Sequence, residues 1–309
     1  MKIMHISDLH LCTQHKPENI VKTGQLLQHA IQMGIDHLVI TGDISHNAQE
    51  DDFASLRKLL AEYNFLSSEK ATLVIGNHDI YGGVYYAMDV IKFPAKCLNT
   101  DFNEKVSVFV HYFRELFQDT LRLNNSDPFP FVKILDNILL LGINSIAPYS
   151  KLKNPMASNG FLGVAAQEKI KCFLKNSIHD GKIKIAVMHH HFKFNASIAV
   201  YYNNRLLKFI EKHSLKLYGK KKVLKLFHKN NINLVLHGHI HSNTHYQVND
   251  IDFLNGGGAI DDYIADRPKY NLIITNGVDY QISQQYLPVE AEPVCPLYAE
   301  IPPLPAIAG

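Results

Sequence analysis

Five short blocks of acidic, amide and imidazole side chains interrupt this chain, each just after a hydrophobic, strand-like segment. The blocks are Asp8-x-His10, Gly42-Asp43, Gly76-Asn77-His78-Asp79, His189-His190-His191 and Gly238-His239-x-His241. In open α/β sheets the carboxyl ends of the strands meet at one edge, and binding sites form there. We therefore expect the five blocks to lie together at one edge of a sheet.

Each block alone has an ordinary structural explanation. An Asp-x-His pair can sit at the surface, Asn and Asp in a loop can cap a helix, and a run of histidines can be exposed. All five blocks in order, each at a strand end, are better explained by chemistry. Carboxylate, amide oxygen and imidazole donors together suit divalent metals such as Mn, Fe, Co, Ni or Zn.

The first part of the chain alternates strand and helix. Residues 2–6 predict a buried strand, and residues 17–34 predict a helix with a proline in its first turn and a glycine at its end. A second strand over 37–41 completes a β-α-β unit, which implies a parallel pair with a right-handed crossover. A helix over 51–63 and a strand over 72–75 continue the alternation.

Further strands are expected over residues 138–144, 183–188, 232–236, 252–255 and 270–275. Two segments, 85–131 and 192–228, interrupt the alternation and are mostly helical in pattern. Both follow site loops, so they form either a cap, with 109–117 and 201–209 over the metals, or helices packed on the flank. We expect one domain over residues 1–287 and an extended, proline-rich tail over 288–309.

Composition limits the alternatives. The chain has 309 residues, 46% of them hydrophobic, which is enough for one large α/β domain. Its formal charge of +2 gives no global field that would favour nucleic acid or membrane as a partner. Four widely spaced cysteines disfavour a thiolate zinc site and a disulfide framework, so we expect a cytoplasmic location. We also expect no signal peptide and no membrane anchor, because no apolar run approaches the roughly 20 residues needed to span a bilayer.

The five blocks, in their order, resemble the signature of calcineurin-like metallophosphoesterases, over residues 1 to about 260. The resemblance implies an α/β fold of two mixed β-sheets packed face to face with flanking helices, and a site for two divalent transition metal ions. By position, Asp8, His10 and His241 would bind one ion. Asn77, His189 and His239 would bind the other, and Asp43 would bridge them. His190 is the alternate ligand to His189, because adjacent histidines allow a slip of one residue.

The resemblance also implies a mechanism. A water held between the two ions loses a proton and attacks phosphorus in line. His78, which is next to a ligand but is not itself assigned to metal, would protonate the leaving oxygen or stabilise the phosphoryl charge. Asp79 would orient either a loop group or the imidazole.

Two positions depart from patterns in the family. Protein phosphatases of this superfamily carry Asp and Arg shortly after the Gly-Asp block, whereas here Ile44-Ser45-His46-Asn47 follows. This argues against a phosphoprotein substrate and leaves the orienting partner of His78 open. Phe192 stands where many relatives have a proline.

The motifs are closest in style to bacterial cyclic-nucleotide phosphodiesterases, so we expect a small phosphodiester of a nucleotide as substrate. A phosphomonoesterase is the near alternative. The basic stretch 216–225 raises a nuclease as another alternative, although a solvated helix end explains it better. A metal-binding scaffold without catalysis is the alternative from a different class. The sequence leaves the oligomeric state open.

Overall fold

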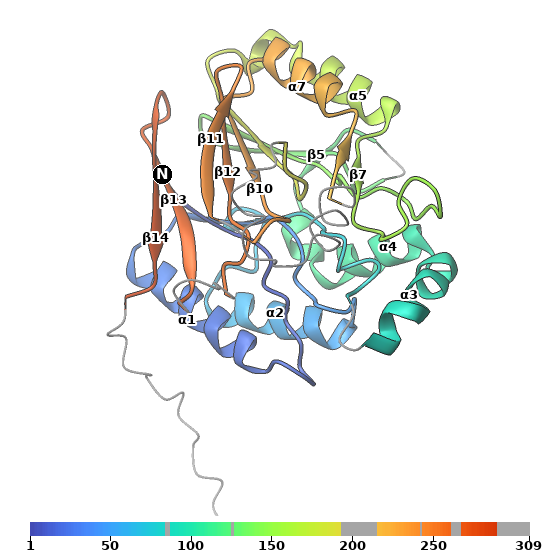
Figure 1. The fold of residues 1–309 in the computed structure, drawn as a ribbon. Helices are drawn as coiled ribbons and strands as arrows, with labels where there is room; N and C mark the ends of the chain where they lie inside the picture. The colour runs from blue at the N-terminus through green and yellow to red at the C-terminus, as the bar shows by residue number, and fades with distance from the viewer. Residues whose placement is uncertain (84–86, 125–126, 193–214, 242, 261–266, 289–309) are drawn as a thin grey trace, which may run out of the picture.

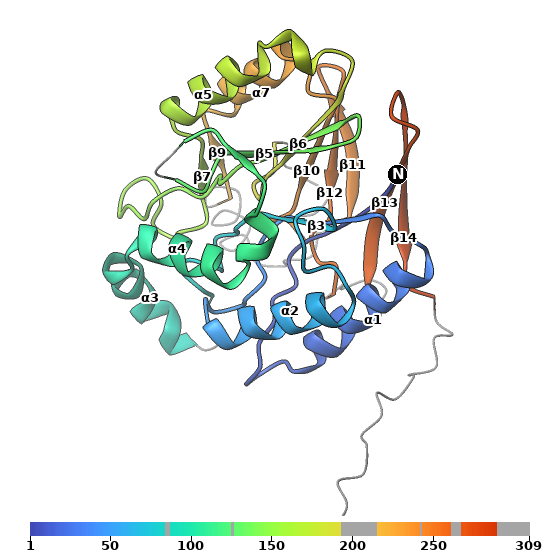
Figure 2. The same cartoon turned by 180° about the vertical axis from the view of Figure 1, so that it is seen from behind.

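The structure is a computed structural model that describes residues 1–309 except 84–86, 125–126, 193–214, 242, 261–266 and 289–309. Its described strands form two large mixed sheets with helices on both outer sides (Figures 1 and 2). This arrangement confirms the fold class expected from the sequence.

The first sheet has five strands in the order β14-β13-β1-β2-β3. They are β1 (Lys2–Ile6), β2 (His37–Ile40), β3 (Ala71–Leu73), β13 (Lys269–Thr275) and β14 (Tyr280–Tyr286). The pairs β1-β2 and β2-β3 are parallel, as the β-α-β reading predicts. On its other side β1 pairs antiparallel with β13, so that Lys2 lies opposite Ile274.

The second sheet has seven strands in the order β11-β12-β10-β8-β6-β5-β4. They are β4 (Leu121–Arg122), β5 (Phe131–Leu135), β6 (Ile138–Gly142), β8 (Ile183–Val187), β10 (Leu234–His237), β11 (Thr244–Val248) and β12 (Ile251–Asn255). Its centre, β12-β10-β8-β6, is parallel and its edges are antiparallel. A separate short pair joins β7 (Gly160–Phe161) to β9 (Leu217–Tyr218).

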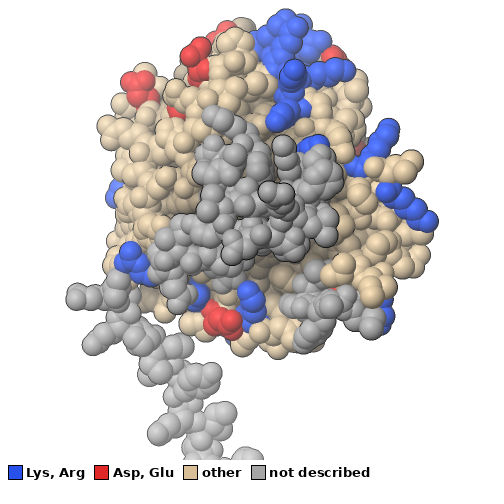
Figure 3. All heavy atoms as spheres, viewed as in Figure 1, with Lys and Arg blue, Asp and Glu red and all other residues tan. Residues whose placement is uncertain are grey.

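The described helices lie outside the two sheets. They are α1 (Glu18–Gln32), α2 (Glu50–Glu62), α3 (Ala87–Asn99), α4 (Phe102–Tyr112), α5 (Val164–Leu174) and α7 (Lys220–Lys229), with 3-10 turns η1 (Arg114–Phe117) and η2 (Ser177–His179). Helices α1 and α2 lie beside the first sheet, and α5 and α7 cover the second (Figures 1 and 2). The exposed face of α7 carries a group of lysines, visible at the top of Figure 3.

Strands in the middle of the second sheet bury both faces. Leu140 of β6 and Ile185 of β8 belong to a core shared with the first sheet, whereas Leu139 and Ala186 belong to a second core under α5 and α7. Successive strand residues point to opposite faces. A strand buried on both sides therefore reads as an unbroken hydrophobic run, and for this reason the sequence predicted these strands.

All the predicted strands are present, with their ends shifted by at most two residues. The sequence did not predict β11 and β14, because alternate residues of these strands are exposed and no hydrophobic run marks them. It also did not predict α5 or β5. In the described ranges no helix is both long and apolar enough to span a bilayer, and Cys12, Cys97 and Cys172 form no disulfide with one another.

The first inserted segment, 85–131, packs largely on the flank. Phe109 of α4 is fully buried, and its ring meets that of Phe53 on α2 edge-on at a centroid distance of 5.8 Å. Phe109 therefore joins α4 to α2 in the helical layer beside the first sheet. In the second segment, 201–209 lies outside the described residues, and α7 packs against α5.

We predict that Phe109→Ala lowers the free energy of unfolding by about 3 to 5 kcal/mol, because it opens a cavity between α4 and α2. Urea denaturation measures this change. Val21→Ala, at a position 63% exposed on α1, is the control and should change stability by no more than about 0.5 kcal/mol. Calorimetric Mn²⁺ binding by the folded Phe109→Ala variant should match that of the unsubstituted protein. Weaker binding would show that α4 reaches the site.

Candidate metal centre

The five blocks converge, because the strands that precede them end at one edge of the two-sheet core. Backbone bonds join the loops directly: Asp8 N donates to Gly42 O at 3.0 Å, and Gly238 N donates to His189 O at 3.0 Å. Between the sheets, His239 N donates to both carboxylate oxygens of Asp8 at 3.1 Å. Loops from the two sheets thus hold one another in place at this edge.

Four of the predicted ligands have a left-handed backbone. The φ angles are +56° at Asp8, +44° at His10, +51° at Asp43 and +75° at His239. This conformation costs a residue with a side chain about 1 to 3 kcal/mol, and such residues gather at functional sites. The strain is therefore consistent with side chains aimed at a common centre.

Close packing of the loops requires glycine beside these ligands. A Cβ atom on Gly76 would overlap the backbone and carboxylate of Asp43, and one on Gly238 would overlap Ser7 and the carboxylate of Asp8. Neither obstacle is the far end of a flexible side chain. The glycines before Asn77 and His239 are thus part of the geometry that brings the ligands together.

The first group of predicted ligands is Asp8, His10 and His241, whose donor atoms lie within 4.8 Å of one another. His10 Nε2 and His241 Nε2 face each other at 2.9 Å, and His241 Nε2 lies 3.7 Å from Asp8 Oδ1. Asp8 and His10 are buried, while the His241 side chain is 30% exposed. The group therefore opens to the surface on the side of His241.

The second group surrounds His189 Nε2. This atom lies 3.0 Å from Asn77 Oδ1, 3.1 Å from His239 Nδ1 and 3.4 Å from Asp43 Oδ2. The other ring nitrogen, Nδ1, donates to Thr41 O at 2.8 Å. That bond fixes the tautomer of the neutral ring, so the lone pair on Nε2 points into the group.

These distances provide a test of whether a metal ion fits. An amide oxygen, a carboxylate oxygen and two imidazole nitrogens are all acceptors when the rings are neutral and bonded as observed. Buried acceptors that face one another repel unless a cation lies between them. The donor set and its convergence fit a divalent transition metal in each group.

The electrostatics point the same way. Burial lowers the pKa of His189, but the charges of Asp43 and Asp8 and the bonds to Asp43 and Thr41 outweigh it and raise the pKa to about 9. Burial raises the pKa of Asp43, but the surrounding histidines outweigh it and hold the pKa well below its usual range. The carboxylates of Asp43 and Asp8 thus favour a positive charge at the position of His189.

The ring of His190 lies 4.4 Å from that of His239 between centroids, but its two nitrogens are bonded elsewhere. Its Nδ1 lies 2.9 Å from Ser145 Oγ and its Nε2 lies 3.2 Å from Ser158 O. Both ring nitrogens therefore have protein partners. Of the two alternatives left open by the sequence, the geometry favours His189.

His78 lies beside the ligands, and its orienting partner is a backbone carbonyl. His78 N donates to Asp43 Oδ1 at 2.8 Å, and the ring Nδ1 donates to His46 O at 2.9 Å. The rings of His10, His46 and His78 form one group of imidazoles. No role for His46 is expected from the sequence. The signal that could have found it is its place in the Gly-Asp loop, three residues after Asp43.

Asp79 orients loops. Its fully buried carboxylate accepts from Ile44 N and Ser45 N at 2.9 Å and from Gly76 N at 2.8 Å. Burial and the charge of Asp43 raise the pKa of Asp79 to about 8, and the backbone donors oppose that rise. Of the two roles expected for this residue, the contacts match the loop role, because they tie the Gly-Asp block to the Gly-Asn-His-Asp block.

A family model described as calcineurin-like phosphoesterase matches residues 1–243, and these residues contain all seven predicted metal ligands. The chain belongs to this family. It is therefore a metal-dependent phosphoester hydrolase. Comparison with curated proteins gave no significant match.

Two solved structures have folds similar to that of this phosphoesterase. A dimetal phosphatase from Danio rerio aligns with a TM-score of 0.61 at 10% identity, covering 93% of this chain and 96% of the other. The purple acid phosphatase PPD1 from yellow lupin seeds aligns with a TM-score of 0.54 at 12% identity, covering 93% and 51%. At such low identities these likenesses establish the fold alone.

We predict that the phosphoesterase binds two divalent ions per chain and that His189→Ala lowers this number. His190→Ala is the matched control and should leave it near two, because the His190 ring nitrogens contact serines. Elemental analysis after reconstitution with Mn²⁺ and gel filtration measures the ratio, and circular dichroism checks the fold of each variant. Saturation at one ion, or loss of metal only in His190→Ala, would contradict the assignment.

Proposed function

We propose that this chain is a phosphodiesterase that hydrolyses a small, nucleotide-like phosphodiester with two divalent ions. One ion would be held by Asp8, His10 and His241. The other would be held by Asn77, His189 and His239, with Asp43 shared between them. The observation that carries the proposal is the convergence of donor atoms in two groups, one of which contains Asp43, with His78 N bonded to the Asp43 carboxylate. The ions would polarise the phosphoryl oxygens and lower the pKa of a water molecule that attacks phosphorus.

The side chains of the protein would supply the remaining steps. Asp43 lies against His189 and accepts a hydrogen bond from the backbone of His78, so its carboxylate fixes the acid relative to the ligands. His78 would protonate the leaving oxygen through Nε2, because its Nδ1 hydrogen is engaged by His46 O. Asp79 would hold the loop after Asp43 and the loop at Gly76 in fixed positions relative to each other. A partly exposed His78 is accessible to a substrate.

The preference for a diester over a phosphoprotein rests on the Gly-Asp loop. The acidic and arginine side chains of the protein phosphatase pattern are absent from the residues that follow Asp43 here, Ile44-Ser45-His46-Asn47. A carbonyl therefore orients His78 where a carboxylate would be expected from that pattern. This supports a substrate other than a phosphoprotein, and a phosphomonoester is the near alternative.

A nuclease is the second candidate, supported by the exposed lysines of α7 (Figure 3). Lys220 connects this helix to a site loop, since its Nζ donates to Phe192 O at 3.2 Å. The buried face of α7, with Val223 and Phe227, packs on the second core. An amphipathic helix with a solvated outer face explains the lysines without nucleic acid, so we favour the small diester.

We predict that His78→Ala lowers kcat for bis-p-nitrophenyl phosphate by about 100-fold to 10,000-fold, which is the usual effect of losing a positioned acid. The metal content should stay near that of the unsubstituted enzyme, because His78 is not among the proposed ligands. His111→Ala, at an exposed position on α4, is the matched control and should retain full activity. Release of metal by His78→Ala would show that the ring is a ligand.

We also predict that the Mn²⁺-loaded enzyme prefers small diesters. The panel is bis- and mono-p-nitrophenyl phosphate, cyclic nucleotides, dinucleotides, nucleoside monophosphates, a phosphopeptide and single-stranded DNA. The highest kcat/KM should be found among the diesters. A preference for monophosphates would establish the near alternative, and a preference for DNA would establish the nuclease. Activity on none of them would favour a non-catalytic scaffold.

A further inference from the structure

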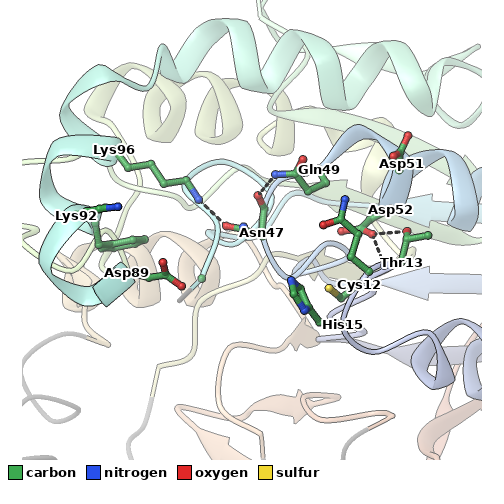
Figure 4. A pocket seen from close by; sticks show the side chains of 13 residues that line it. Cys12, Thr13, His15, Asn47, Gln49, Asp51, Asp52, Asp89, Lys92 and Lys96 are labelled. Carbon is green, nitrogen blue, oxygen red and sulfur yellow. Dashed lines mark hydrogen bonds between the residues drawn. The ribbon is translucent and has the colours of Figure 1, made fainter. Parts of the chain in front are cut away.

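A cavity adjoins the metal centre on the side of His78. A cavity of about 600 Å³ opens between the loop after His10, the loop after Asp43 and helix α3 (Figure 4). Gly83 lines this cavity, and a Cβ atom placed on it would collide with the rings of His78 and His46. Gly83 thus contacts the two imidazoles on one side and faces the cavity on the other. The cavity lies next to the group that we assign to the leaving oxygen.

Helix α3 turns one face to this cavity. Asp89, Lys92, Phe93 and Lys96 all line it, and their spacing of three, four and seven residues places them on one side of a helix. Figure 4 shows Lys96 reaching from α3 to Asn47, where its Nζ donates to Oδ1 at 2.5 Å. Burial lowers the pKa of Lys96 and the charge of Lys105 adds to this effect, whereas the charges of Cys97 and Asp89 oppose it. The Lys96 side chain is exposed, so its ammonium group can contact a ligand in the cavity.

The carboxylates around the cavity have other roles. Asp52 is buried and accepts from Thr13 N, Thr13 Oγ1 and Ser45 Oγ at 2.7 to 3.0 Å. Asp51 and Asp89 lie in the first turns of α2 and α3, where the helix dipole stabilises a negative side chain. Among the described residues, no ion pair joins Lys92 or Lys96 to a carboxylate. Two cationic groups thus remain available to a ligand.

We propose that this cavity is the leaving-group subsite and that Lys92 and Lys96 bind a second phosphate carried by the substrate. The inference rests on the proposed function for its orientation, because His78 marks the leaving-group side. The volume lies in the usual range of ligand pockets, roughly 300 to 1,000 Å³, and can accommodate a nucleoside. The amides of Asn47 and Gln49 offer hydrogen bonds to its polar groups. The substrate class is a nucleotide ester with a second, distant phosphate, in preference to a cyclic mononucleotide with one.

The test is calorimetric titration of the Mn²⁺-loaded protein with adenosine 3′,5′-bisphosphate, adenosine 3′-monophosphate and adenosine 5′-monophosphate. We expect the bisphosphate to bind about tenfold or more tightly than either monophosphate, as one charged hydrogen bond can provide. The variant Lys92→Gln/Lys96→Gln should reduce this advantage to about twofold or less and leave monophosphate binding unchanged. Lys58→Gln/Lys175→Gln removes the same charge at exposed positions outside the cavity and should keep the advantage.

Equal affinity for all three ligands in the unsubstituted protein would overturn the inference. So would an advantage that survives in Lys92→Gln/Lys96→Gln, or an equal loss of all three affinities, which would indicate a structural role. Hydrolysis of bis-p-nitrophenyl phosphate is followed in parallel and should be unchanged in the control variant Lys58→Gln/Lys175→Gln. If the unsubstituted protein hydrolyses no ester but binds the bisphosphate selectively through these lysines, the proposed function and the leaving-group assignment fail, whereas the phosphate-binding role of the two lysines stands.

Discussion

Mutual repulsion among buried acceptor atoms is the constraint on which the rest of this structure depends. His189 Nε2 is held within 3.1 Å of both Asn77 Oδ1 and His239 Nδ1, out of contact with water. Without a cation such an arrangement is unfavourable while the rings are neutral, because each desolvated acceptor then lacks a donor. The loops must therefore be rigid before any ion arrives. The three backbone bonds to Asp79 and the left-handed ligand residues are the means by which the chain achieves this.

The two hydrophobic cores make that rigidity possible. A left-handed residue other than glycine costs on the order of 1 kcal/mol, and four of the ligands adopt this conformation. Burial of a leucine or isoleucine side chain contributes about 1.5 to 3 kcal/mol, and the central strands of the second sheet place such residues on both faces. The site is thus a locally strained edge on a strongly stabilised body. In enzymes, backbone strain is commonly concentrated at the functional site, and the surrounding core supplies the stability that maintains it.

The sequence predicts the ligands because each block is local and follows a strand that its own hydrophobic run defines. Other features depend on contacts that no local pattern specifies. The preference for His189 over His190 rests on contacts of the His190 ring with Ser145 and Ser158, which lie far away in the sequence. The role of His46 escaped prediction because it acts through its carbonyl, which every residue possesses. The cavity beside His78 depends on the docking of α3, which no local pattern specifies. The packing of α4 on α2 likewise joins residues that are far apart in the sequence.

The pairing of β1 with β13 has a consequence for how the protein is made. β1 lies between β2, formed early in synthesis, and β13, which starts at residue 269. Until β13 emerges, one edge of β1 has no partner and presents unpaired amides and carbonyls, which favour association with other chains. The ligands are divided in the same way, since His239 and His241 follow Asp8 and His10 by more than 200 residues. Such long-range contacts form slowly. A nascent chain would thus contain the early predicted ligands well before the late ones are synthesised. Protection of the β1 edge and completion of the metal centre would therefore both come late, when the C-terminal part of the chain joins the fold.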